Sequence, residues 1–151
     1  GGREGPDPML VAGRVGSAAE GVGVARGAMD MTVDYLRQRK QFGKVIGEFQ
    51  ALQHRASHLY SEVEIARAVT IKAAQLVDGG SEKADLMASV AKAKVAKVAG
   101  LAVREGVQMH GGIGMTDEYD IGLYMKRDRA LQEFLGDQYY HTGRVAELSG
   151  Y

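Results

Sequence analysis

The chain has 151 residues, of which 45% are hydrophobic and 25% charged, so it is long enough to bury the core of one globular domain. Nineteen basic residues balance nineteen acidic ones, and a chain without net charge has no overall field that attracts nucleic acid or an anionic membrane. No cysteine is present, which excludes a disulfide scaffold, a zinc-thiolate site and a thiol nucleophile and is compatible with a cytoplasmic location.

The sequence shows no segment for membrane insertion or export. The best apolar stretch, residues 95–103, contains a lysine and is much shorter than a membrane span. The first residues lack the apolar core of a signal peptide. Because residue 1 is glycine rather than methionine, we expect the chain to be one domain of a longer, cytoplasmic protein.

The first predicted helix begins at Asp7 and Pro8, because aspartate is a favoured N-cap and proline is tolerated at the first helical position. It is expected to run to about Arg37, since apolar residues recur at spacings of three and four. These residues are Val11, Val15, Ala18, Val22, Ala25, Met29, Val33 and Leu36. We interpret its five glycines, at positions 13, 16, 21, 23 and 27, as points of close helix approach or, alternatively, of ligand contact.

Two further long helices are predicted, from about Glu48 to Val77 and from about Glu82 to Met109. Between them, Gly79 and Gly80 can end one helix in the left-handed conformation and Ser81 can cap the next. The apolar positions of the two helices are Phe49, Leu52, Ala56, Leu59, Val63, Ala66, Val69 or Thr70, Ala73 and Leu76, then Met87, Ala91, Val95, Val98 and Ala102. The lysines of the third helix, Lys92, Lys94 and Lys97, are expected mostly on its outer face.

A glycine-rich loop and two shorter helices, at about residues 121–135 and 137–148, complete the chain. No run alternates apolar and polar residues for long enough to indicate a strand. The sequence therefore predicts an all-α fold with a single domain over residues 1–151. Its architecture is an antiparallel four-helix-type bundle, made of three long helices and a shorter C-terminal helical pair.

Basic residues surround Phe42 and Gly43 at the break after the first helix; they are Arg37, Arg39, Lys40 and Lys44. Cations at the end of a helix complement its dipole, which is one interpretation. The other is a phosphate or pyrophosphate site, because arginine presents a planar fork of donors to anionic oxygens. Phe42 would then cover an apolar ring of the same ligand.

The second irregular segment, residues 111–114, reads Gly-Gly-Ile-Gly and follows Gln108 and His110. It is either a helix stop or a place where a backbone or cofactor approaches closely. It is not a dinucleotide-binding fingerprint, since no strand precedes it and the G-x-G-x-x-G spacing is absent.

Metal and hydrolytic sites are poorly supported by the sequence. His54, His58 and Glu62 share one helical face, but a di-iron bundle needs Glu-x-x-His on two helices, which the chain lacks. We therefore expect no metal. No G-x-S-x-G nucleophile elbow is present either.

The two irregular segments together resemble the acyl-CoA dehydrogenase family. Residues 39–50 are similar to its motif RxxFGxxIxxxQ, residues 108–119 to its motif Q-x-x-G-G-x-G-x-x-x-E-Y, and the likeness extends from Arg14 through Tyr140. The resemblance implies the C-terminal helical domain of a longer chain, through which four subunits assemble with FAD at a subunit interface.

The family pattern assigns roles to individual positions. It implies that Arg39 meets the FAD pyrophosphate of a neighbouring subunit, and that Gln41 and Phe42 line its adenosine portion. Arg14 matches an arginine placed near the acyl-CoA. The full set of cofactor positions implied by the resemblance is Arg39, Gln41, Phe42, Gln50, Gln108, Gly111 and Gly112.

The implied reaction is α,β-dehydrogenation of an acyl-CoA, with hydride transfer to FAD and reoxidation by an electron-transfer flavoprotein. The family places its catalytic carboxylate at one of two positions, which here hold Leu135 and Gly13. Neither accepts a proton, and Glu133 and Asp137 should point elsewhere if the helix is continuous. Asp137 and Tyr139 also replace the Thr and Gln that the family usually carries after the glycine.

Three hypotheses follow. The chain belongs to a heteromeric dehydrogenase whose partner, a paralogous subunit, supplies the base. Alternatively, it belongs to a dehydrogenase of identical subunits whose base lies in other domains or in an unrecognised carboxylate. In the third hypothesis the fold is a non-catalytic assembly or binding module. In each of them the isolated domain should be inactive.

Overall fold

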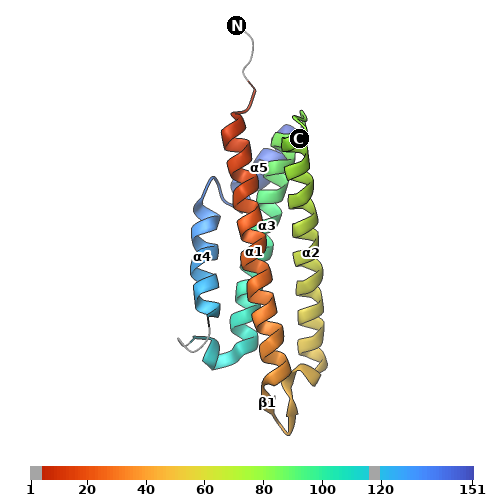
Figure 1. Ribbon diagram of the computed structural model, residues 1–151, viewed down its shortest axis with the longest axis vertical. Helices are drawn as coiled ribbons and strands as arrows, with labels where there is room; N and C mark the ends of the chain where they lie inside the picture. The colour runs from red at the N-terminus through yellow and green to blue at the C-terminus, as the bar shows by residue number, and fades with distance from the viewer. Residues whose placement is uncertain (1–4, 116–119) are drawn as a thin grey trace.

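A computed structural model describes residues 5–115 and 120–151. Three long helices lie along its long axis and alternate in direction (Figure 1), and two shorter helices pack against them. This confirms the all-α bundle of three long helices and a C-terminal pair. The helices are α1 Pro8–Gln38, α2 Gln50–Asp78, α3 Ala84–His110, α4 Ile121–Glu133 and α5 Gln138–Leu148.

Helix α3 lies at the centre and packs against each of the other four helices. Its buried positions are mostly Ala and Val, which allows close approach. Gly21 of α1 lies directly against Val95, and a Cβ on Gly27 would come within 2.6 Å of Tyr124. These two glycines, like Gly13, are therefore packing positions, whereas Gly16 and Gly23 face open space.

The predicted helix ends are confirmed to within about two residues. Asp7 accepts a hydrogen bond from the amide of Met9 at 2.9 Å, and Pro8 is the first residue of α1. Gly80 adopts φ +63 after α2. The Ser81 hydroxyl accepts a hydrogen bond from the amide of Lys83 at 3.1 Å, just before α3.

A short β-hairpin between α1 and α2 corrects the expectation of no strand. Strands β1 (Lys40–Gln41) and β2 (Lys44–Val45) pair antiparallel, and a 3-10 turn, η1 (Ile46–Glu48), leads into α2. Two-residue strands are too short to show an alternating pattern, so no strand could be predicted here from the pattern of apolar residues. The hairpin forms the end of the bundle opposite the start of α1 (Figure 1).

Lys92 was predicted on the outer face of its helix, and that prediction was wrong. Its side chain is 3% exposed, and its ammonium donates a hydrogen bond to the carbonyl of Leu131 at 2.7 Å. This carbonyl belongs to the last turn of α4, where a cation is favourable. Burial lowers the pKa of Lys92, while the charges of Asp128 and Asp137 act in the opposite direction.

The fourth helix ends earlier than predicted. It stops at Glu133, Leu135 adopts φ +59 and Gly136 adopts φ +101, so residue 135 lies in a break between α4 and α5. A continuous helix to residue 135, on which the expected directions of Glu133 and Asp137 depended, is therefore excluded. Asp137 instead caps α5 by accepting a hydrogen bond from the amide of Tyr140 at 2.8 Å.

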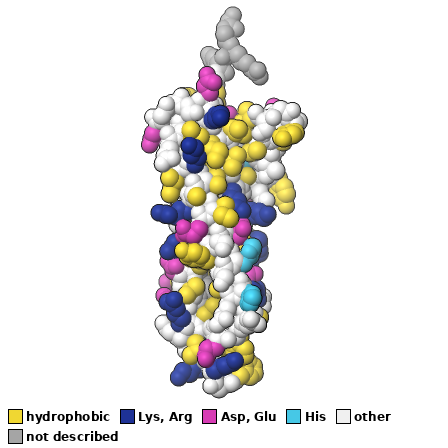
Figure 2. All heavy atoms as spheres, turned by 90° about the vertical axis from the view of Figure 1, so that its right-hand side faces the viewer, with side chains coloured by type: hydrophobic (Ala, Val, Ile, Leu, Met, Phe, Trp, Pro, Cys, Tyr) yellow, Lys and Arg dark blue, Asp and Glu magenta, His cyan; other side chains and the backbone are white. Residues whose placement is uncertain are grey.

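No helix among the described residues is long and apolar enough to cross a membrane. The face shown in Figure 2 carries basic and acidic side chains interspersed, and apolar side chains gather between them. This face presents no continuous block of positive charge, in agreement with the balanced composition.

Candidate functional site

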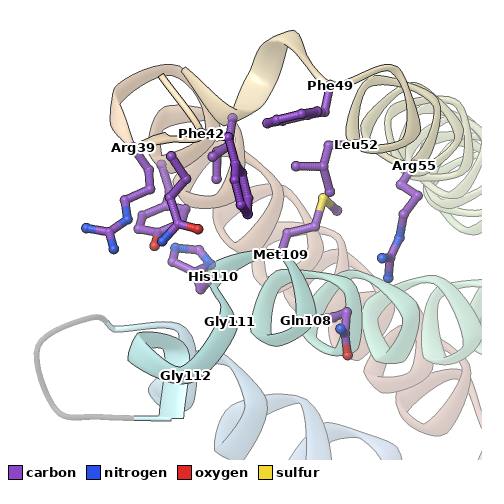
Figure 3. Close-up of a pocket in the computed structure, with 13 residues that line it drawn as sticks. Arg39, Phe42, Phe49, Leu52, Arg55, Gln108, Met109, His110, Gly111 and Gly112 are labelled. Atoms are coloured by element: carbon purple, nitrogen blue, oxygen red, sulfur yellow. The ribbon is translucent and has the colours of Figure 1, made fainter. Parts of the chain in front are cut away.

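The two motif segments meet in one groove at the hairpin end of the bundle. The groove has a volume of about 480 Å³ and lies between the hairpin, the start of α2 and the end of α3. Figure 3 shows Arg39 and Phe42 on one side, and Arg55 and Gln108 at the other end. The lining residues are Tyr35, Arg39, Gln41, Phe42, Ile46, Phe49, Leu52, Arg55, Gln108, Met109, His110, Gly111 and Gly112.

Phe42 is held in an unusual conformation at the tip of the hairpin. It has φ +56, the next residue Gly43 has φ +79, and its side chain is 88% exposed. Positive φ at both central residues is the geometry of a tight two-residue turn, but a bulky residue rarely adopts it. The ring contacts Phe49 edge-on, with 6.1 Å between centroids. A strained aromatic residue presented to solvent beside a groove is an outlier that points to a function.

The groove combines two arginines with no acidic residue in its lining. Arg39 is exposed, and no described carboxylate forms an ion pair with it. Arg55 is bound bidentately by Glu105 at 2.7 and 2.9 Å, and that hydrogen bonding raises the pKa of Arg55. Arg39 is thus the lining cation whose charge is available to an anionic ligand.

The end of α3 forms the wall opposite the hairpin. His110 is buried, stacks on Tyr35 with 4.4 Å between ring centroids, and donates from Nδ1 to the carbonyl of Gly106 at 2.7 Å. Gly111 and Gly112 follow on the exposed side, in the 3-10 segment η2 (Gly111–Met115), with open space where a Cβ would stand. This wall therefore leaves backbone accessible to a ligand.

Six of the seven predicted cofactor positions line the groove; they are Arg39, Gln41, Phe42, Gln108, Gly111 and Gly112. Gln50 does not, and lies exposed at the first position of α2. The last part of the second motif, residues 116–119, lies outside the described residues. Sequence reasoning missed Leu52 and Arg55 as lining residues, although they lie in the first and second turns of α2 and so close to the hairpin.

Arg14, predicted to lie near the acyl-CoA, is 5% exposed and lies in the N-terminal part of α1, whereas the groove lies at the C-terminal end of that helix. Its guanidinium lies 3.4 Å from the carboxylate of Asp85 on α3. Its Nε has no hydrogen-bond partner among the described residues. In this chain Arg14 is part of a buried ion pair, and its substrate role stays a prediction.

Residues 13 and 135, the two positions that the resemblance assigns to the catalytic base, lie side by side. A Cβ built on Gly13 would stand 3.0 Å from Cδ1 of Leu135, although 122 residues separate them in sequence. Both are apolar, and the nearby Glu133 is exposed. Sequence alone named these positions but gave no sign of their contact.

The three residues weighed as metal ligands do not form a cluster. His54 and His58 are exposed on α2, while Glu62 accepts a hydrogen bond from Lys94 at 2.7 Å. That bond lowers the pKa of Glu62. Among the described residues, no group of three potential metal ligands converges.

Comparison with known proteins gives one consistent result. The family profile described as "Acyl-CoA dehydrogenase, C-terminal domain" matches residues 7–149. The chain is 39% identical over 114 residues to the mitochondrial short/branched chain specific acyl-CoA dehydrogenase of Bos taurus, covering 76% of this chain and 26% of that protein.

Solved structures agree. Butyryl-CoA dehydrogenase from Megasphaera elsdenii superposes with a TM-score of 0.89 at 30% identity, over 93% of this chain and 36% of that one. The ChsE4-ChsE5 complex from Mycobacterium tuberculosis superposes with a TM-score of 0.88 at 26% identity, over 95% of this chain and 39% of the matched chain. The chain therefore belongs to the acyl-CoA dehydrogenase family, as its C-terminal helical domain. It spans between about a quarter and two-fifths of the length of these relatives.

Proposed function

We propose that this chain is the cofactor-contacting and subunit-contacting domain of an FAD-dependent acyl-CoA dehydrogenase that introduces an α,β double bond into an acyl-CoA thioester. One observation carries the proposal: residues 39–42 and 108–112, far apart in sequence, line a single groove. Family membership supports the reaction class. FAD would supply the hydride acceptor, and this chain's residues would bind and orient it.

The groove's chemistry fits the dinucleotide half of FAD. The Arg39 guanidinium is a forked donor for pyrophosphate oxygens, and no acidic residue of the lining would repel that anion. The Phe42 ring offers an apolar face for adenine. Gln41 and Gln108 add amide donors and acceptors, and the open space at Gly111 and Gly112 leaves room for a ligand near the backbone.

We further propose that the protein is one subunit of a heteromer and that a paralogous partner supplies the catalytic base. The apolar contact between Gly13 and Leu135 supports this, because neither base position can take up a proton. The ChsE4-ChsE5 complex is an example of a related assembly built from two different chains. Acyl-CoA as substrate, an electron-transfer flavoprotein as oxidant and a cytoplasmic location complete the proposal.

The cofactor role can be tested through Arg39. In the full-length protein, Arg39→Ala should lower the FAD retained after gel filtration by about tenfold or more, since a charge-assisted contact to the pyrophosphate is lost. Arg37→Ala is the matched control, because Arg37 is exposed in the last turn of α1 and does not line the groove. Equal FAD content in both variants would contradict the proposal.

The heteromer can be tested by anaerobic mixing with acyl-CoA. The purified homomer should keep its flavin oxidised for long periods, whereas the complex with a co-purified paralogue should bleach rapidly. Mass measurement of the co-purified chain would identify that partner. Rapid bleaching of the homomer would place the base elsewhere in the same chain, and no bleaching by either sample would favour the non-catalytic assembly module.

A further inference from the structure

A continuous series of hydrogen bonds runs beneath the break between α4 and α5. The Arg144 guanidinium donates to the hydroxyl of Ser89 at 2.9 Å. That hydroxyl lies 3.1 Å from Nδ1 of His141, and Nε2 of His141 lies 2.7 Å from the carbonyl oxygen of Leu135. Ser89 and His141 are fully buried, so these groups have no water to replace a lost partner.

The donor and the acceptor of each hydrogen bond in this series can be assigned from the chemistry of the groups involved. A carbonyl oxygen only accepts, so Nε2 of His141 carries the proton. Arginine only donates, so the Ser89 hydroxyl accepts from Arg144; in the neutral imidazole with its proton on Nε2, Nδ1 accepts, and the hydroxyl donates its own proton to it. The neutral Nε2-protonated form of His141 therefore satisfies all three bonds. Burial lowers the pKa of His141, the charges of Arg14, Lys92 and Arg144 lower it further, and the bond to Leu135 opposes them.

The series is anchored on Asp85, at the N-terminal end of α3. Arg144 binds the Asp85 carboxylate through two nitrogens at 3.0 and 2.8 Å, and hydrogen bonding to Asp85 raises the pKa of Arg144. Arg14 of α1 approaches the same carboxylate at 3.4 Å. Helices α1, α3 and α5 are thus tied together directly below residue 135.

Gly136 makes room for this contact. Its φ of +101 is unfavourable for a residue with a side chain, and a Cβ there would meet the Tyr140 ring and lie 2.8 Å from Nε2 of His141. The Tyr140 ring and the His141 imidazole therefore together occupy the space that a side chain at 136 would fill. The preceding residue, Leu135, keeps a left-handed backbone without being glycine, a conformation that persists only where its surroundings enforce it.

We infer that His141 is a positioning residue, which holds Leu135 in its left-handed conformation through the carbonyl and so fixes residue 135 against Gly13. His141 acts through residue 135 and does not itself touch substrate. The inference rests on the proposed function and extends it, because it names the residue that determines where the side chain at the usual base position, residue 135, is held. The held conformation, however, is a property of this chain alone and is testable without any ligand.

The test compares His141→Gln with His141→Asn in the full-length protein by hydrogen exchange and mass spectrometry. The Gln amide can reach the place of Nε2 and keep the bond to Leu135, whereas the shorter Asn amide can satisfy only the Ser89 side. Peptides spanning residues 134–141 should exchange about three- to tenfold faster in His141→Asn, and within about twofold of wild type in His141→Gln. Equal acceleration in both variants, or none in either, would overturn the inference.

A second measurement connects the inference to the reaction. In a Leu135→Glu background, His141→Asn should lower kcat for anaerobic flavin reduction while leaving KM for acyl-CoA unchanged, and His141→Gln should restore kcat. Equal kcat in the two double variants would overturn the inference. If Leu135→Glu reduces no flavin at all, the proposed base position fails, and the exchange experiment still decides the role of His141.

Discussion

The hairpin that carries Phe42 and the break that carries Leu135 lie at opposite ends of the bundle, yet they share one backbone feature. Phe42 and Leu135 are the non-glycine residues with positive φ among those the structure describes. Around them the two regions differ: Phe42 is 88% exposed, whereas Leu135 is half-buried with its carbonyl bound by His141. The left-handed backbone at Phe42 thus exposes a side chain to solvent, whereas the left-handed backbone at Leu135 is held by a hydrogen bond from a buried residue.

The different surroundings of Phe42 and Leu135 show how each left-handed backbone conformation is maintained. At the hairpin, a tight turn closed by backbone bonds, such as Ile46 N–H to the Arg39 carbonyl at 2.8 Å, is sufficient. At the break, a buried set of side chains from three helices is required. We therefore expect the break to be sensitive to distant substitutions and the hairpin to be sensitive mainly to its own residues.

The largest expected effect is the loss of Asp85. Asp85→Ala should lower the free energy of unfolding by about 3 kcal/mol, because the buried Arg14 and the partly buried Arg144 would both lose the carboxylate that pairs their charge. Chemical denaturation followed by circular dichroism measures it. Asp30→Ala is the matched control, since its ion pair with Arg26 is exposed and should contribute less than about 0.5 kcal/mol. Similar decreases in unfolding free energy for Asp85→Ala and Asp30→Ala would mean that the ion pairs of Asp85 stabilise the protein no more than an exposed ion pair does.

Restoring a carboxylate at the break should change the chemistry. In the full-length protein, Leu135→Glu should accelerate anaerobic flavin reduction by acyl-CoA at least about 100-fold, the usual contribution of a general base. Stopped-flow absorbance of the flavin measures the rate. Leu135→Gln has the same size without a base and should remain slow; equal rates for the two variants would exclude residue 135 as a base position.

A side chain at Gly136 should disturb the break but not the hairpin. Gly136→Ala should destabilise the protein by about 1–3 kcal/mol, because φ is positive and the new Cβ would press on Tyr140 and His141. Thermal unfolding gives the value. Gly143 lies within α5 with open space around it, so Gly143→Ala should stabilise the protein by up to about 1 kcal/mol. A neutral Gly136→Ala would show that the break tolerates ordinary backbone geometry.

Acid should weaken the break through His141. Because burial lowers the pKa of His141, the folded state binds fewer protons than the unfolded state, whose histidine titrates near pH 6.5. Stability should fall as the pH drops below about 6.5, by at most about 1.4 kcal/mol per unit, and level off below the folded pKa. The slope of unfolding free energy against pH should be smaller in His141→Gln, and an unchanged slope would assign the acid sensitivity to other groups.

The smallest effect is expected at the hairpin. Phe42→Asn should leave stability unchanged or raise it by about 0.5 kcal/mol, since asparagine tolerates the left-handed conformation better, while FAD retention falls. Leu135→Asn, with the same backbone benefit, should instead destabilise because it loses apolar contact with α1. Thermal unfolding of the two variants tests whether the hairpin tolerates the substitution and the break does not. A destabilising Phe42→Asn would contradict this difference between the two regions.

Local patterns in the sequence were enough to predict the helices and the groove. Apolar spacing and the cap at Asp7 located α1, and two motifs located six of the residues that line the groove. The sequence also predicted the separation of the last two helices, but it did not predict that α4 ends at Glu133 or that Leu135 adopts a positive φ. Lys92, Ser89 and His141 could not be placed, because their burial depends on partners many residues away in sequence.

Residues 13 and 39 mark the two ends of α1, and a helical rise of 1.5 Å per residue puts them roughly 40 Å apart. No single small molecule reaches from one to the other. Under the proposed function, each chain would therefore place its residues near position 39 at one reaction centre and those near position 13 at a different one. In the proposed heteromer, a subunit without a catalytic base at residue 135 would still be needed to bind the cofactor through residue 39. This would explain why an enzyme retains a subunit that cannot abstract the proton itself.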